Sequence, residues 1–235
     1  MLLICLCVAA CGQSTISSTT GSFPRFTVVK GQLDADGFPT SGAKLCVLGR
    51  RDICFQMPSQ TLPGPSAVTY DFGLDPRSER LPLASGGSWV FFAATFSAGG
   101  SGTLERLAVL RYEGDGGESK IVNVMPFVGV TNVSDRAMWT VPSASDYPIL
   151  IEADFIWGEG EGHFGEHFYT VEAWYFDPRA DRYAKAFSYR TAKKYDGGDR
   201  ARVRVLVPER QEILRRLVRR RTPERQETMR PRGAK

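Results

Sequence analysis

Short hydrophobic runs, separated by segments rich in glycine, proline and polar residues, extend along residues 26–207. Alternation with a period of two is typical of a strand buried on one face, whereas a run that is apolar on both faces is typical of a fully buried strand. Residues 89–96 are of the second kind and predict a central strand. Residues 149–157 alternate, with Glu152 and Asp154 on the polar side, and predict a half-buried strand. The pattern as a whole predicts an all-β fold of antiparallel sandwich or meander sheets.

The last third of the chain ends the strand pattern and begins a helical one. Residues 168–176 and 183–191 flank an Asp-Pro turn and predict an aromatic-rich hairpin, which residues 202–207 follow as a short strand. Over residues 208–221 apolar positions recur at helical spacing after an opening proline, so we expect one short, C-terminal amphipathic helix. Residues 222–235 have the composition of a disordered basic tail. The apolar face of the expected helix is Ile213, Leu214, Leu217 and Val218.

Residues 26–48 form two alternating runs around an Asp-Gly turn, and a proline and a Gly-Ala pair open the second run. This stretch resembles the opening of carboxypeptidase regulatory-like (transthyretin-like) β-sandwich modules, over about a tenth of the chain. The resemblance implies an accessory sandwich, over residues 23–85, and implies no chemistry. The matching positions are Gly31, Leu33, Asp34, Gly37, Pro39, Gly42, Ala43 and Leu45.

A weak internal similarity links residues 89–117 with residues 149–181. Each stretch has a hydrophobic strand ending in Ala-x-Phe, a glycine-rich loop, a strand ending in an aromatic residue, and a turn. The spacing predicts two related β-meanders packed together within a β-rich domain over residues 86–207. Chance similarity between two strand–loop–strand units is the alternative. Ala94 and Phe96 correspond to Ala153 and Phe155, and Val109 and Tyr112 correspond to Ala173 and Phe176.

The amino terminus resembles the leader of a bacterial lipoprotein. An apolar run over residues 2–9 is followed at once by Ala10, Cys11 and Gly12, as in a lipobox, and the run is too short to span a bilayer. We therefore expect a signal peptide over residues 1–10, diacylglycerol on Cys11 and a flexible polar tether over residues 11–22. No Lys or Arg precedes the apolar run. An ordinary secreted protein and a misassigned start are the alternatives.

Two of the five cysteines, Cys46 and Cys54, lie in the expected body of the protein. They flank a Gly-Arg-Arg-Asp turn between two alternating apolar runs, which predicts a β-hairpin with the cysteines opposite each other. A cross-strand disulfide is expected because an exported protein lies where disulfides persist. Two free buried thiols are the alternative.

Both histidines and three carboxylates lie in the glycine-rich stretch 158–167. His163, Glu166 and His167 match H-x-x-E-H, the zinc motif of inverzincin peptidases, which requires a helix to place both imidazoles on one face. The glycines and the β-forming residues that follow oppose a helix, and in a strand Glu166 would point away from both histidines. A metal-dependent hydrolase centred on these three residues remains an alternative, although zinc is not expected. An acidic loop whose histidines lie against aromatic residues is the simpler interpretation.

Charge is concentrated at the C-terminus. Residues 208–235 contain ten Arg or Lys and four Glu, a net charge of +6 that leaves −2 for the rest of the chain. A cluster of arginines of this kind could bind a polyanion, and outside the cytoplasm anionic lipid headgroups or cell-wall polymers are more plausible ligands than nucleic acid. Cations near the negative end of a helix are the simpler interpretation. The candidate residues are Arg215, Arg216, Arg219, Arg220 and Arg221.

Together these features predict a non-catalytic lipoprotein of the cell envelope, lipid-anchored outside the cytoplasm. Its body is expected to be an accessory or binding module with no cofactor beyond the lipid on Cys11. The expected partners are the membrane surface and an envelope protein or polysaccharide, with no nucleic acid. The sequence contains no G-x-S-x-G nucleophile elbow and no phosphate-binding glycine loop. The alternatives are the metal-dependent hydrolase and adhesion to polyanions or membrane surfaces through the C-terminal arginines.

Overall fold

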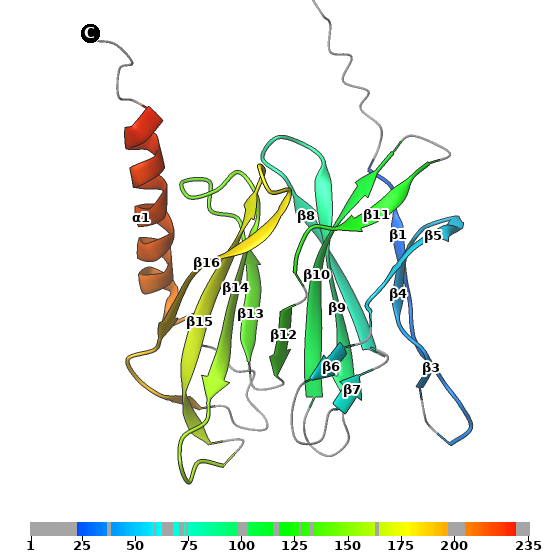
Figure 1. The fold of residues 1–235 in the computed structure, drawn as a ribbon, viewed down its shortest axis with the longest axis horizontal. Helices are drawn as coiled ribbons and strands as arrows, with labels where there is room; N and C mark the ends of the chain where they lie inside the picture. The colour runs from blue at the N-terminus through cyan, green and yellow to red at the C-terminus, as the bar shows by residue number, and fades with distance from the viewer. Residues whose placement is uncertain are drawn as a thin grey trace, which may run out of the picture.

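The structure is a computed structural model, and most of the chain from Phe23 onward is described in it. The described residues form antiparallel sheets and the helix α1 (Arg210–Thr228), so the fold is all-β with one C-terminal helix, as predicted. Figure 1 shows four layers side by side: an N-terminal sheet, two meanders and α1. The described ranges are 23–36, 39–58, 60–62, 68–70, 73, 75–97, 103–114, 118–126, 128–131, 134–162, 165–196 and 205–228.

The N-terminal sheet has the strand order β1-β4-β5, and a two-stranded extension, β2 and β3, continues β1 and β4. The Asp-Gly turn predicted between the first two runs lies between β2 and β3, where the Asp36 N–H donates to Asp34 Oδ1 at 3.0 Å. The resemblance to transthyretin-like modules stays a prediction. The strands are β1 (Phe26–Val29), β2 (Gln32–Leu33), β3 (Pro39–Ser41), β4 (Lys44–Val47), β5 (Arg50–Gln56) and the separate pair β6 (Gln60–Leu62) and β7 (Val68–Tyr70).

Two meanders follow, and in each of them four consecutive strands pair in sequence order. β8 precedes the domain boundary expected after residue 85, yet it pairs with β9 along its length, so the first meander extends across that boundary. The first meander is β8 (Asp75–Pro82), β9 (Ser88–Ser97), β10 (Thr103–Glu113) and β11 (Lys120–Asn123), with β12 (Val128–Thr131) also paired to β10. The second is β13 (Asp135–Trp139), β14 (Ile149–Ile156), β15 (Glu166–Asp177) and β16 (Arg182–Arg190), with β17 (Tyr195–Asp196) paired to β15.

The two meanders share a topology but not a register. Ala94 pairs with Arg106, whereas Ala153 pairs with Val171. A register shift of one residue moves side chains to the opposite face of a sheet. Val109 accordingly packs between the meanders, while its expected counterpart Ala173 packs toward α1. The expected correspondence is therefore wrong for this pair of positions, and an internal duplication stays a prediction.

The first meander is buried on both faces, as the apolar run over residues 89–96 predicts. Alternate residues such as Phe92 and Ala94 pack against Leu45 and Met57 on the side of the N-terminal sheet. The residues between them pack on the second meander, and they include Phe91, Ala93, Leu107 and Val109, which meet Leu150, Phe176 and Tyr183.

The outer face of the second meander is covered by α1. Ile151, Ala153 and Val171 pack with Ile213 and Leu217 of the helix in one buried cluster. Hydrogen bonds fix the helix in place: the Tyr189 hydroxyl donates to Glu209 at 2.9 Å, and the Leu206 N–H donates to Asp135 at 2.8 Å.

The C-terminal elements differ from the expectation at three points. Residues 205–207 form no strand, because Leu206 already lies in the turn that leads into α1, and residues 202–204 lie outside the described part. The helix begins at Arg210 and runs to Thr228, so residues 222–228 are helical rather than disordered. Val218, expected on the apolar face, is 43% exposed.

Candidate functional site

Three charged side chains join the two meanders where their facing surfaces become polar. Arg77 of β8 makes a bidentate ion pair with Glu105 of β10, with Nε–Oε1 at 2.9 Å and Nη2–Oε2 at 3.1 Å. Arg136 of β13, in the second meander, also binds Glu105 through its Nη2. Glu105 is buried, so one carboxylate between two guanidinium groups links the sheets.

A row of charged residues continues from Arg136 across the inner face of the second meander. Arg136, Glu152 and Glu172 are direct cross-strand partners on β13, β14 and β15. Glu152 accepts a hydrogen bond at 3.1 Å from the indole Nε1–H of Trp174, and Glu172 binds Lys185 at 2.6 Å. We call Arg77, Glu105, Arg136, Glu152, Glu172 and Lys185 the charged cluster.

Burial dominates the titration of the charged cluster. Glu152 is only 6% exposed. Burial, together with the nearby Glu172 and Asp154 carboxylates, raises the pKa of Glu152 to about 8, and the Trp174 hydrogen bond acts in the opposite direction. Burial likewise lowers the pKa of Arg136 to about 10, with Arg77 acting in the same direction. Glu152 therefore carries its proton at neutral pH while the arginines stay charged.

The carboxyl pair of Glu152 and Glu172 accommodates this proton. Glu152 Oε2 has no hydrogen-bond partner within the described residues when the group is ionised. A protonated Glu152 donates instead to the Glu172 carboxylate beside it, a contact that also raises the pKa of Glu152. A neutral acid beside an ionised one is an arrangement that acid–base catalysts use. Here the carboxyl is enclosed by two sheets, so a substrate would reach it only if the meanders separated.

Period-two alternation identified the polar side of β14 but not its surroundings. The same pattern arises whether that side meets water or another sheet, and Glu152 and Asp154 were therefore expected on a solvated face. That expectation is wrong for Glu152, which faces the first meander. Arg77 and Glu105 lie on the first meander, more than thirty residues from Arg136 along the chain. No local sequence pattern therefore predicts that these three side chains meet.

The H-x-x-E-H stretch does not form the helix that its zinc motif requires. Glu166 and His167 begin β15, so their side chains point to opposite sides: Glu166 is exposed and His167 is fully buried. His163 lies outside the described residues. In the part of the chain that is described, no group of three or more His, Cys, Asp or Glu side chains is arranged to hold a metal ion.

His167 is instead paired with Glu161, a residue that the motif does not include. His167 Nδ1 lies 2.7 Å from Glu161 Oε2, and Glu161 also binds Lys194 Nζ at 2.7 Å. The hydrogen bonds from Lys194 and His167 lower the pKa of Glu161 to about 2. The ring of His167 packs against Phe155 and Trp157, with centroids 5.0 and 5.7 Å apart. The interpretation of a histidine lying against aromatic residues is therefore confirmed for His167.

The predicted pairing of Cys46 with Cys54 is confirmed. The two residues are cross-strand partners in β4 and β5 and form a disulfide. The turn lies earlier than expected, at Leu48 and Gly49, because Gly49 adopts the left-handed conformation (φ 84°). Arg50, Arg51 and Asp52, which were also expected in the turn, belong to β5. The register shifts there beside the disulfide, and the Arg50 and Asp52 side chains form an ion pair at 2.8 Å.

Only part of the arginine cluster in α1 is described. Arg215 and Arg216 both bind Glu212, which lowers the pKa of that carboxyl to about 2. Arg216 also lies over the ring of Tyr189, 4.2 Å from its centroid. Arg219 is exposed. The side chains of Arg220 and Arg221, like residue Cys11, lie outside the described part.

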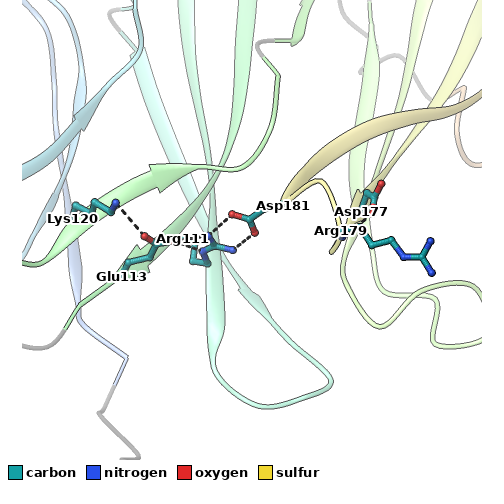
Figure 2. Close-up of polar contacts among 6 residues, drawn as sticks. All are labelled: Arg111, Glu113, Lys120, Asp177, Arg179 and Asp181. Carbon is teal, nitrogen blue, oxygen red and sulfur yellow. Dashed lines mark hydrogen bonds and ion pairs between the residues drawn. The ribbon is translucent and has the colours of Figure 1, made fainter.

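A second ion pair joins the meanders near the solvent. Figure 2 shows Arg111 of β10 facing Asp181, which lies in the turn between β15 and β16. Both guanidinium nitrogens reach the carboxylate, at 2.7 and 2.8 Å, and this lowers the pKa of Asp181. Glu113 binds Arg111 from the other side and Lys120 at 3.5 Å.

The class of protein that these features define is a layered antiparallel β-protein whose two central sheets meet through an apolar cluster and a charged one. Comparison with protein-family models, curated proteins and solved structures finds no match. Within the described residues, no helix is long and apolar enough to cross a bilayer.

Proposed function

We propose that the chain is an exported, lipid-anchored protein of the bacterial cell envelope, whose β-rich body is a non-catalytic accessory or binding module. The observation that carries the proposal is the disulfide between Cys46 and Cys54. Structural disulfides form and persist in oxidising compartments outside the cytoplasm. The apolar run before Cys11 and the polar residues after it support the same location, since they resemble a lipoprotein leader and its tether.

The contacts of the charged side chains support a module rather than a reaction centre. Glu105 joins Arg77 to Arg136 across the two meanders, and Glu161 joins His167 to Lys194. Glu105 lies between two guanidinium groups, and Glu161 lies between the Lys194 ammonium and the His167 ring, so each carboxylate connects elements of the fold. An envelope protein or polysaccharide is the expected ligand of such a body.

Metabolic labelling with a palmitate analogue tests the anchor. The wild-type protein should be labelled and Cys11→Ser should not. Cys7→Ser is the matched control, because that cysteine lies within the expected leader and its loss should leave labelling unchanged. Equal labelling of the wild type and Cys11→Ser would overturn the proposed anchor.

Thiol trapping in intact cells tests the compartment. Without reductant, Cys46 and Cys54 should resist alkylation in the wild type, and Cys46→Ser should expose the thiol of Cys54. If both thiols of the wild-type protein react without reductant, the protein is in a reducing compartment and the proposal fails.

A further inference from the structure

The two ends of the molecule, along the direction of the strands, carry different connections. In Figure 1 the beginning of β1 and the C-terminal end of α1 lie at the same end of the molecule, the upper end of the view. The β2–β3 and β14–β15 connections lie at the opposite end. The exposed side chains of those connections include Asp34, Asp36 and Glu159. The arginine-rich C-terminal part of α1 therefore points toward the end of the molecule at which β1 begins.

The C-terminal part of α1 is strongly basic. Residues 215–228 contain six arginines and two glutamates, and three of the arginines are consecutive at positions 219–221. Glu212 already pairs with Arg215 and Arg216. Arg219 is exposed one turn beyond Arg215 and Arg216, and Arg220 and Arg221 follow it in the sequence.

The tether restricts which surface this end of the molecule meets. Given the lipid on Cys11, on which this inference rests, residues 11–22 connect the membrane to the described body. Twelve residues span at most about 40 Å when fully extended. As a flexible chain they span about 20 Å. The end of the body at which β1 begins therefore stays close to the lipid headgroups, and α1 points to the same side.

We propose that the C-terminal end of α1 binds anionic phospholipid headgroups and forms a second membrane contact beside the lipid anchor. The diacylglycerol expected on Cys11 carries two acyl chains, and a basic surface beside it adds an electrostatic contact of a different kind. Each arginine near an anionic membrane contributes a factor of about five in affinity. The attraction is expected to weaken as salt is added, since the charges are exposed.

Vesicle co-sedimentation of the full chain with Cys11→Ser tests this contact without the acyl group. Vesicles of phosphatidylcholine alone report any binding through the apolar leader, which all variants share. Adding phosphatidylglycerol should increase binding at low salt. Replacing Arg219, Arg220 and Arg221 together by Gln should weaken that increase by about a hundredfold, at a factor of about five for each arginine. Circular dichroism should stay unchanged, because Arg and Gln have similar helix propensities.

The matched control removes three positive charges elsewhere, with Lys30→Gln, Arg190→Gln and Lys193→Gln. Arg190 ends β16 opposite Thr170, near the beginning of β15, and so lies away from the C-terminal end of α1. Binding should stay within about twofold of the parent, well below the effect of a single arginine. Unchanged binding after the arginine replacements, equal loss in the control, or binding to isolated cell-wall polymer but not to vesicles would each overturn the proposal. The palmitate labelling is independent, so a failed anchor and a failed headgroup contact give different results.

Discussion

The interface between the two meanders has two parts that are held together in different ways. At one part aromatic and aliphatic residues pack closely: the ring of Trp89 lies 4.7 Å from Phe176 and 5.2 Å from Tyr147. At the other part, Glu105 binds Arg77 and Arg136, and Glu152 lies beside Glu172. We call the first part the apolar cluster. Its buried members are Leu81, Trp89, Phe91, Ala93, Leu107, Val109, Val124, Met125, Leu150, Phe176 and Tyr183, and Tyr147 packs against them.

The two parts respond differently to the loss of a group. In the apolar cluster the free energy of packing is shared among many contacts, so truncation lowers stability in proportion to the volume removed. In the charged cluster the attraction between charges offsets a large desolvation penalty, so removing one partner leaves another buried charge uncompensated. The apolar cluster therefore stabilises the interface through packing. The charged cluster is stable only when all of its charged partners are present.

The largest effect is expected in the apolar cluster. Trp89→Ala should lower the free energy of unfolding by about 4 kcal/mol, because a buried indole is replaced by a cavity. Urea denaturation measures the change, and Trp89→Phe should give an intermediate value. The control is Trp157→Ala, at a tryptophan that is 58% exposed. It should change stability by about 0.5 kcal/mol. Equal losses at both tryptophans would show that the apolar cluster is not the main source of stability.

In the charged cluster, Glu105→Gln should lower the free energy of unfolding by about 3 kcal/mol. The reason is that Arg136, whose side chain is 20% exposed, loses its carboxylate partner while it remains buried. Glu79→Gln, at an exposed glutamate of β8, is the control and should stay within about 0.5 kcal/mol.

A double replacement sharpens the interpretation of Glu105. Glu105→Leu combined with Arg136→Met removes both charges and should recover part of the lost stability. If the double variant is less stable than Glu105→Gln, the ion pair itself is the source of stability, and the contrast between the two clusters disappears.

The pH dependence that Glu152 imposes is expected as a slope rather than as a single loss of stability. Its pKa is raised to about 8 in the folded protein from an ordinary value of 4.5. Between these values the folded state holds a proton that the unfolded state has released, so stability should fall as the pH rises, by up to about 1.4 kcal/mol per pH unit. Glu152→Gln, whose amide replaces the protonated carboxyl, should remove this slope.

Urea denaturation of the wild type and Glu152→Gln between pH 5 and pH 8, taken as a difference, isolates the carboxyl. The two proteins should be similar near pH 5, and the variant should be the more stable near pH 8. Glu166→Gln, on the exposed side of β15, should keep the wild-type slope. Parallel curves for the wild type and Glu152→Gln would show that this carboxyl is ionised in the folded state.

The smallest effect is expected at the ion pair near the solvent. Asp181 is 57% exposed and holds Arg111 across the meanders. Asp181→Asn should lower stability only slightly at low salt and by still less at high salt. Asn is the appropriate replacement because it tolerates the left-handed backbone of this position (φ 52°). A loss as large as that of Glu105→Gln would show that exposure does not separate the two ion pairs.

The strands of the central hairpins could be predicted because their signals are local. The continuous apolar run at residues 89–96 becomes a strand buried on both faces, and the cysteine spacing places Cys46 opposite Cys54. The burial of Glu152 could not be predicted, since it depends on a sheet from elsewhere in the chain that packs against β14. The partner of His167 was missed for a similar reason: glycines allow the loop to return Glu161 to the ring, and no spacing rule identifies it.

Local sequence patterns were sufficient to predict the antiparallel strands, the C-terminal helix and the pairing of two cysteines, because each depends on periodicity or on neighbours within a hairpin. Tertiary structure alone decided which polar faces are buried, how far α1 extends, and that the registers of the two meanders differ by one residue. These outcomes depend on contacts between layers, where a carboxylate such as Glu105 meets partners on two strands that belong to different sheets. The alternating pattern of a strand is the same whether its polar face meets water or another sheet.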